Sequence, residues 1–311
     1  MMRVFSIIVI IFLLLILVFL SVYLLIMRIF FQRALGRKNT IKRLEEKSEL
    51  IDLFKIDLCF WEKNKFEELT MISEDGLKLK AHFLRREQSN KTAIVVHGYA
   101  ADYREMSNYS RMFVEMGYNV LVLENRAHGK SEGTMIGMGY YDKYDILSWI
   151  EIVKNKIENS KIVLFGLSMG ASAVCMTLGE QLPKNVVCAI SDCAFDNVYN
   201  QIKHVFNPKN KKTKNKLLSM FNSYMKRAYS FDLKNADASI CLKKNNLPVL
   251  FIHGKEDSYV PVDNVYRLTA NLSDFKKDVY LAEQSGHAMS YVTNPRRYEI
   301  RVREFLKKWG M

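Results

Sequence analysis

The most informative segment of the chain reads Lys161-Ile-Val-Leu-Phe-Gly-Leu-Ser-Met-Gly170. It begins with a short apolar run of branched side chains, which is typical of a fully buried strand. The small residues that follow it predict a tightly packed helix. An abrupt turn from strand to helix strains the backbone, and Gly166 and Gly170 let neighbouring segments approach closely. The pattern therefore predicts that Ser168 projects its hydroxyl from the turn as a nucleophile, beside helix amides that stabilise negative charge.

Alternating strand-like and helix-like segments surround this turn. Strands are expected at residues 66–72, 77–84, 92–96, 119–123, 162–165, 186–190, 249–252 and 278–281. Helices are expected at residues 104–116, 140–157 and 295–309. This alternation predicts an α/β fold with a mainly parallel sheet covered by helices on both faces. Functional residues are then expected in loops at the carboxyl ends of the strands.

A serine nucleophile needs a base, and the chain offers six histidines. His287 lies in Gln284-Ser-Gly-His-Ala288, after the last expected strand and downstream of every other candidate group. We therefore predict His287 as the base. His97 and His253 are expected to bind loop backbone, and His82 to pack or to lie at the surface. His128 lies in a turn and His204 in the basic stretch described below, and neither is given a role.

The base works best when a carboxylate fixes its tautomer, and that carboxylate should follow an earlier strand. The segment after the strand at 249–252 offers Glu256 and Asp257. We predict Asp257, with Asp192, just after the strand at 186–190, as the alternative. The resulting chain order is Ser, Asp, His.

The N-terminal segment from Val4 to Met27 contains no charged residue. About 20 apolar residues suffice to span the hydrocarbon core of a bilayer, so this segment is expected to form a single membrane-spanning helix. A cleaved signal peptide is the alternative. The bulky residues from Met27 to Phe31 do not form the small-residue cleavage site that such a peptide needs. The flank that follows is rich in Lys and Arg, which places the catalytic domain in the cytoplasm by the positive-inside rule.

The chain has 311 residues, 49% of them hydrophobic and 25% charged, which fits one large domain with an appendage. We expect a transmembrane anchor with a basic flank at 1–38, a helical stem at 39–65 and a catalytic domain at 66–311. A helical cap is expected at about 196–240, because two apolar helical patterns interrupt the alternation there. Residues 197–231 carry eight basic and no acidic side chains before Asp232. This stretch is either a solvated surface or one that contacts anionic lipid or attracts acidic substrates. A basic cap near a bilayer would also suit a lysophospholipid or another amphiphilic acyl ester.

Several functional classes find no support in the sequence. The five cysteines form no CxxC pair, which argues against a disulfide framework or a zinc site. No phosphate-binding glycine loop or metal-ligand cluster is evident, so no cofactor and no metal are expected. The net charge of +13 is not accompanied by a nucleic-acid-binding motif. Nucleic acid is therefore not an expected partner; the lipid bilayer and a small or amphiphilic acyl substrate are.

Four motifs in this order resemble the α/β-hydrolase fold family over roughly residues 66 to 309. They are His97-Gly98-Tyr99, the Gly166–Gly170 turn, His253 to Pro261, and Ser285-Gly-His287. The segment from Glu124 to Gly133, with Gly139 to Trp149 after it, further resembles a bacterial membrane-anchored branch. Its relatives are serine-aminopeptidase-like (S33) and esterase-like proteins. Ala127 stands where such sequences usually have Gly, and Glu124 where they often have Asp.

The resemblance implies an oxyanion hole formed by the backbone amides of Tyr99 and Met169. It also implies a serine hydrolase that forms an acyl-enzyme, with a carboxylic ester as the expected bond. An aminopeptidase or amidase is the enzymatic alternative. A membrane-bound binding module with the same fold but no activity is the non-enzymatic one, and a complete set of catalytic residues disfavours it.

Overall fold

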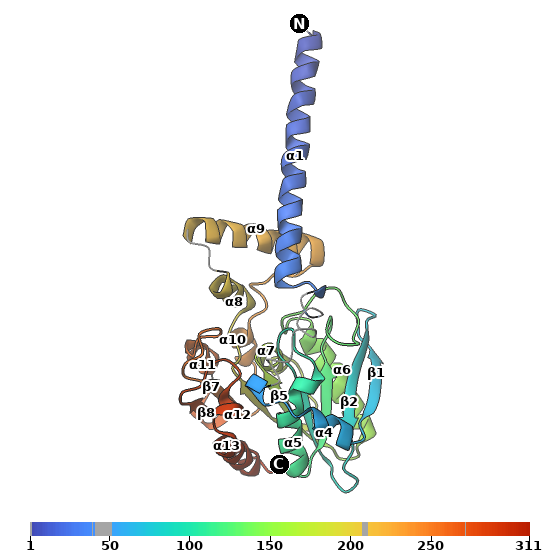
Figure 1. Ribbon diagram of the computed structural model, residues 1–311, viewed down its shortest axis with the longest axis vertical. Coiled ribbons are helices and arrows are strands. Elements are labelled where there is room, and N and C mark those ends of the chain that lie inside the picture. Colours follow the sequence, from blue (N-terminus) through green and yellow to red (C-terminus); the bar gives the residue numbers. More distant parts are fainter. Residues whose placement is uncertain (1, 39, 41–51, 207–210, 271) are drawn as a thin grey trace.

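The computed structural model describes residues 2–38, 40, 52–206, 211–270 and 272–311, and its centre is one eight-stranded sheet (Figure 1). The strands run in the order β1-β2-β4-β3-β5-β6-β7-β8. β2 pairs antiparallel with both β1 and β4, and the remaining neighbours are parallel. The bounds are Glu67–Ile72 (β1), Lys78–Leu84 (β2), Lys91–Val96 (β3), Asn119–Glu124 (β4), Lys161–Leu167 (β5), Val186–Asp192 (β6), Val249–Gly254 (β7) and Lys277–Ala282 (β8). All eight predicted strands and the α/β-hydrolase architecture are confirmed.

Two apolar cores form because successive side chains of a strand point to opposite faces of the sheet. In β3, Ala93 and Val95 belong to one core and Ile94 and Val96 to the other. The first core is covered by α5 (Ser107–Glu115) and α13 (Pro295–Lys308). The second is covered by α6 (Asp142–Lys156), α7 (Met169–Thr177), α10 (Ala238–Leu242) and α11 (Asp263–Thr269). The sheet is buried on both faces, as its continuous apolar strands predict.

The short elements differ most from expectation. The helix expected at 104–116 begins as a 3-10 turn, η1 (Tyr103–Met106), before α5. The chain also forms α12 (Ser290–Thr293) and η2 (Asp274–Lys276), which, like α10 and α11, are too short to show a helical period. Part of the predicted stem at 39–65, namely residues 39 and 41–51, lies outside the described residues. Its described part includes α4 (Leu58–Lys63), which begins where the Asp57 side chain accepts from the Phe60 amide.

The N-terminal helix α1 (Met2–Ala34) extends away from the sheet and is long and apolar enough to cross a membrane (Figure 1). Its side chains from residue 4 to 26 are exposed, apart from the half-buried Tyr23. Met27 and Phe31, one helical turn apart, are buried instead. The helix therefore has an exposed part that suits lipid and a last part that packs against the protein.

The cap consists of the two expected helices, α8 (Val198–Val205) and α9 (Lys211–Tyr229), and α9 lies across the end of α1 (Figure 1). The Phe30 ring packs edge-on against Phe206 and Phe221, with ring centroids 4.8 and 4.4 Å apart. Phe31 stacks on Tyr229 at 4.4 Å. The end of α1 thus belongs to the same packed unit as the cap. The domain boundaries proposed at residues 38 and 65 remain predictions.

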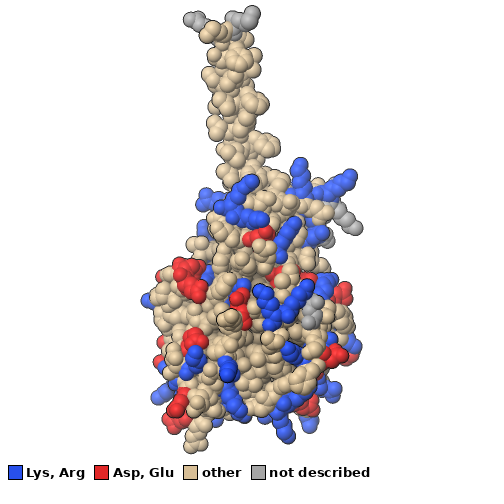
Figure 2. Space-filling model, turned by 180° about the vertical axis from the view of Figure 1, so that it is seen from behind, with Lys and Arg blue, Asp and Glu red and all other residues tan. Residues whose placement is uncertain are grey.

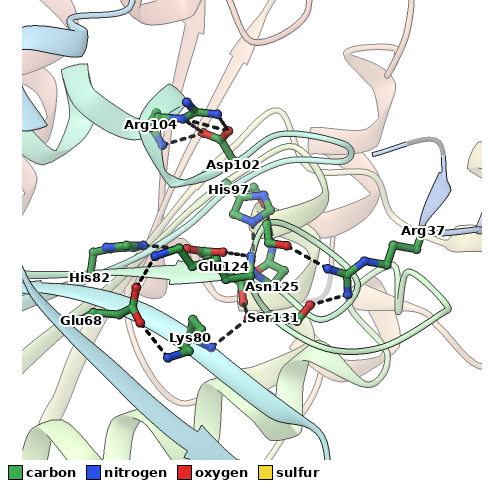
Figure 3. A network of polar contacts seen from close by, with 12 residues as sticks. Arg37, Glu68, Lys80, His82, His97, Asp102, Arg104, Glu124, Asn125 and Ser131 are labelled. Carbon is green, nitrogen blue, oxygen red and sulfur yellow. Dashed lines mark hydrogen bonds and ion pairs between the residues drawn. The ribbon is translucent and has the colours of Figure 1, made fainter. Parts of the chain in front are cut away.

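Polar contacts then tie the chain after α1 to the loop that follows β4. Gly36 forms an antiparallel bridge with Met135. The Arg37 guanidinium donates to the carbonyl oxygens of Ser131 at 2.5 Å, Gly129 at 2.8 Å and Gly133 at 3.3 Å (Figure 3). Three carbonyl acceptors on one guanidinium fix the direction in which α1 leaves the domain.

Candidate active site

Ser168 occupies the sharp turn between β5 and α7, with φ 54° and ψ −114°. Non-glycine residues rarely adopt such angles, and they persist only where the surroundings enforce them. A Cβ on Gly166 would lie 2.3 Å from the Gly170 carbonyl oxygen, and one on Gly170 would lie 2.2 Å from that of Val96. Both positions therefore exclude any side chain. The predicted strand–turn–helix geometry is confirmed.

Replacing Gly170 by alanine is expected to lower the free energy of unfolding by about 3 kcal/mol or more, since the new Cβ overlaps main-chain oxygens that cannot move aside. Gly286→Ala is the matched control, because a methyl group there would have nothing within 4 Å and the φ of Gly286 is not positive. Thermal unfolding of the full chain in detergent measures both variants. Equal midpoints for Gly170→Ala and wild type would show that the turn is not packed as described.

Three side chains from three strand ends converge at this turn. The Ser168 Oγ lies 2.8 Å from Nε2 of His287, in the loop after β8. The His287 Nδ1 lies 2.7 Å from Oδ2 of Asp257, in the loop after β7. The structure thus brings together the predicted nucleophile, base and carboxylate in one hydrogen-bonded line.

The Asp257 carboxylate is held by several donors. Its Oδ1 accepts from the amides of Tyr259 at 3.0 Å and Val260 at 2.8 Å. His253 Nε2 lies 3.4 Å from Oδ2 and 2.8 Å from the Val260 carbonyl oxygen. Burial acts to raise the pKa of Asp257, but hydrogen bonds from His253 and His287 outweigh it and lower this pKa to about 2. The carboxylate is therefore ionised at neutral pH and fixes the Nδ1–H tautomer of His287.

The alternative carboxylate, Asp192, has a different partner. Its Oδ2 accepts from the Tyr298 hydroxyl at 2.9 Å, and its main-chain oxygen accepts from the Ser168 amide at 2.8 Å. Burial raises the pKa of Asp192 to about 7. Asp192 therefore supports the turn through its main-chain oxygen, and Asp257 is the residue that contacts the imidazole.

Two buried histidines support the loop that carries Gly98 and Tyr99. The Nε2 of His128 accepts from the Ala100 amide at 3.1 Å, and its Nδ1 lies 2.9 Å from the Arg126 carbonyl oxygen. The Nε2 of His97 accepts from the Asn125 amide at 3.1 Å (Figure 3). Each ring is neutral, with its Nδ1 protonated. Sequence reasoning expected His97 to bind loop backbone, which is confirmed, but it gave His128 no role.

Because His128 is neutral in the folded chain, we expect the fold to lose stability in acid. Burial and the neighbouring His97 lower the pKa of His128 from 6.5 to about 3, so the unfolded chain binds a proton that the folded chain refuses. The contribution is fully present above pH 6.5 and is lost as the pH falls from 6.5 toward 3. The free energy of unfolding should be about 2 kcal/mol lower at pH 5 than at pH 7 from this group alone. Thermal unfolding of His128→Gln should show a correspondingly flatter pH dependence, and an unchanged slope would contradict this account.

The two departures from the family pattern lie in a well-braced loop. Glu124 Oε1 lies 2.6 Å from Nε2 of His82, and its Oε2 accepts from the Lys130 amide (Figure 3). Ala127 is buried and adopts φ 62°, a conformation that suits the glycine found in similar sequences. Neither residue contacts Ser168, Asp257 or His287 in the contacts described above.

The loop after β3 passes beside the nucleophile. A Cβ on Gly98 would lie 3.4 Å from the Ser168 Cβ and 4.0 Å from its Oγ. Tyr99, the next residue, lines the space around Ser168, and its hydroxyl donates to the Ala34 carbonyl oxygen at 3.0 Å. Met169 is the first residue of α7, where amides have no intrahelical acceptor. The two residues predicted for the oxyanion hole thus flank Ser168.

Comparison with known proteins gives the same fold. The sequence profile of the family described as "Serine aminopeptidase, S33" matches residues 87–239. The Bacillus subtilis protein YqkD is 29% identical over 232 residues, which cover 74% of this chain and 76% of that one. The Pyrococcus furiosus esterase Pf2001 superposes with a TM-score of 0.64 at 24% identity, over 79% of this chain and 93% of the esterase. The chain has the α/β-hydrolase fold. A membrane protein of Saccharomyces cerevisiae, YNL320W, is 21% identical over 79% of this chain and 81% of its own length.

Two cavities meet at Ser168, and Tyr99 and Tyr259 line both. One has a volume of about 210 Å³ and extends past His287 toward Leu53, Phe54, Met106 and Val292. The other has a volume of about 360 Å³ and extends toward α1 and α8. Apolar walls with a few polar groups at the junction are typical of sites that bind small organic molecules.

One further group could in principle bind a metal ion. Cys193, Asp257 and His287 offer ligand atoms within 4.8 Å of one another. Burial raises the pKa of the Cys193 thiol, whereas a metal ligand must be a thiolate. Asp257 and His287 are also already hydrogen-bonded to each other. The donor set therefore suits a proton relay better than a metal.

Proposed function

We propose that the chain is a membrane-anchored serine hydrolase that cleaves a carboxylic ester through an acyl-enzyme. The observation that carries the proposal is the continuous hydrogen-bonded line from Ser168 through His287 to Asp257, with separations of 2.8 and 2.7 Å. The strained turn beneath Ser168 supports it, because strain of this kind persists at functional sites.

In the proposed reaction His287 Nε2 takes the proton of the Ser168 hydroxyl as Oγ attacks the ester carbonyl carbon. The Tyr99 and Met169 amides stabilise the negative charge on the carbonyl oxygen, and each such donor is typically worth about 2.7–4 kcal/mol. The carbon–oxygen ester bond then breaks, and the imidazolium gives its proton to the leaving alcohol. Water activated by His287 attacks the acyl-enzyme and releases the carboxylic acid. Asp257 stays ionised throughout and stabilises the imidazolium.

The anchor belongs to the proposal as well. The exposed apolar part of α1 fits a single span, and the yeast relative named above is called a membrane protein. The basic side chains near the inner end of α1 favour a catalytic domain on the cytoplasmic side of the cell membrane. Protection of a cysteine introduced near the C-terminus from an impermeant maleimide in intact cells would support this orientation, and labelling in intact cells would contradict it.

The basic cap is proposed to contact anionic lipid head groups. Exposed basic side chains of α9 include Lys212, Lys216, Lys226 and Arg227. The Tyr23 hydroxyl of α1 lies 3.4 Å from the Met220 carbonyl oxygen of α9, so the cap sits at the level where the exposed part of α1 ends. Figure 2 shows Lys and Arg gathered around the base of α1.

Neutralising Lys212, Lys216 and Lys226 to glutamine should weaken the dependence of activity on anionic lipid, because each basic group near a charged leaflet is worth about 1 kcal/mol. Activity in bilayers with and without phosphatidylserine, at low and high salt, measures the effect. An anionic-lipid dependence that is identical in the triple variant and in wild type would exclude this contact.

Amide or peptide hydrolysis is the second candidate, because the matching family profile is that of a serine aminopeptidase. The same residues serve both reactions, since the acyl-enzyme is common to them. Hydrolysis of nitrophenyl esters by the full chain in detergent should exceed that of aminoacyl nitroanilides in kcat/KM. The reverse order would favour the peptidase. A folded wild-type chain that reacts with neither substrate nor a fluorophosphonate would instead indicate a binding module.

A further inference from the structure

The N-terminal helix supplies one wall of the larger cavity beside Ser168. Phe30, Arg33 and Ala34 of α1 line this cavity, together with Ile202, Val205 and Phe206 of the α8 segment. Phe195, Met138 and Met169 line it as well. Its walls are therefore mainly apolar, and they include residues that sequence analysis assigned only to the membrane anchor.

The position of His287 distinguishes the roles of the two cavities. In acyl transfer the imidazolium must deliver its proton to the departing oxygen, so the alcohol lies on the side of the histidine. His287 lines the smaller cavity, of about 210 Å³, and is absent from the lining of the larger one. The leaving alcohol therefore belongs in the smaller cavity, and the acyl group in the larger cavity of about 360 Å³.

The larger cavity lies next to the part of α1 that suits lipid. The unbroken exposed stretch of this helix ends at Ile26, and Phe30 follows four residues later. At 1.5 Å per residue the two positions are about 6 Å apart along the helix axis. Val205, which also lines the cavity, is 50% exposed. An acyl chain can thus reach the cavity from the bilayer with little passage through water. This matters because exposing its methylene groups to water is unfavourable.

We infer that the end of α1 forms a wall of the acyl-binding pocket, and that the substrate is a single-chain, long-acyl ester of a small alcohol, taken from the leaflet around this helix. The inference rests on the proposed function, since it assigns the two sides of the same acyl-transfer site. It adds that the anchor selects the substrate as well as holding the enzyme at the membrane.

A bulky substitution at the end of α1 tests whether this helix forms a wall of the acyl-binding pocket. Ala34→Phe is made in the full chain and reconstituted in nanodiscs. The ratio of kcat/KM for a dodecanoyl ester to kcat/KM for a butanoyl ester should fall by roughly 10-fold or more. Even one methylene in an apolar pocket changes selectivity on that scale. Val205→Phe fills the same cavity from the α8 segment and should shift the ratio in the same direction. Because Val205 is half exposed, this second variant does not depend on repacking a core.

Leu25→Phe is the matched control, because it adds the same ring to the 58% exposed side of the same helix, outside the cavity. It should leave the chain-length ratio at the wild-type value. Labelling by a short fluorophosphonate shows that each variant is folded. The pocket assignment would be overturned if Ala34→Phe and Val205→Phe both reacted with the fluorophosphonate but kept the wild-type chain-length ratio. If the wild-type chain still hydrolysed esters, the proposed function would stand.

A second experiment tests whether the substrate enters the cavity from the leaflet around α1. Wild-type enzyme should hydrolyse a long-chain ester in its own nanodisc at least about 10-fold faster than the same amount presented in separate nanodiscs, because a long acyl chain leaves a bilayer slowly through water. Equal rates would overturn the leaflet route. Wild-type enzyme that hydrolyses no acyl ester of any chain length would overturn the inference together with the proposed function.

Discussion

Replacing Ser168 by alanine is expected to lower kcat/KM for a carboxylic ester by about 10⁴- to 10⁶-fold, because the hydroxyl that forms the acyl-enzyme is lost. The Ser168 Oγ is the atom within 2.8 Å of the imidazole. Removing it leaves the oxyanion donors and the binding cavities, which together retain only a small part of the rate enhancement. Steady-state kinetics of the full chain in detergent, with a nitrophenyl ester, measures the loss.

Ser172→Ala is the matched control for this substitution. Ser172 lies one helical turn further along α7, where its Oγ accepts from the Phe195 amide at 2.9 Å. Its loss should cost about 1 kcal/mol of stability and less than about 10-fold in activity. If Ser168→Ala kept activity within about 10-fold of Ser172→Ala, Ser168 would not be the nucleophile.

Asp257→Asn should lower kcat by about 10⁴-fold while leaving the fold intact. The asparagine Oδ1 can still accept from the Tyr259 and Val260 amides, but its amide group would face the Nδ1 of His287. An N–H donor there forces the imidazole proton onto Nε2, which can then no longer accept the serine proton. The pH–rate profile and kcat of the folded variant measure the effect.

Asp192→Asn separates the two candidate carboxylates. Its side chain contacts Tyr298 and is not within the hydrogen-bonded line to Ser168. This variant should lose less than about 10-fold in kcat, because an amide oxygen can still accept from the Tyr298 hydroxyl. A larger loss for Asp192→Asn than for Asp257→Asn would contradict the assignment of the carboxylate.

The strands and the candidate catalytic residues could be predicted because each has a local signature. Continuous apolar runs mark β3, β5 and β7 as buried on both faces, and the glycines around Ser168 mark a turn that only they permit. His287 and Asp257 could be placed because parallel strands end at one edge of the sheet. Their convergence follows from topology alone.

The walls of the site could not be predicted, because they depend on contacts between distant segments. Phe30 reads as one more apolar residue of a membrane helix, and nothing local distinguishes it from a residue that faces lipid. Its ring nevertheless packs against Phe206 and Phe221, which are far away in the sequence. His128 was missed for the same reason, since its acceptor role depends on the Ala100 amide in another loop.

Covalent labelling tests the central claim most directly. Full-length wild-type chain should react with a fluorophosphonate, and mass spectrometry of the digested protein should locate the single adduct on Ser168. Labelling should be lost in Ser168→Ala and strongly slowed in His287→Ala. An adduct on any other residue, or no adduct on a folded chain, would contradict the account.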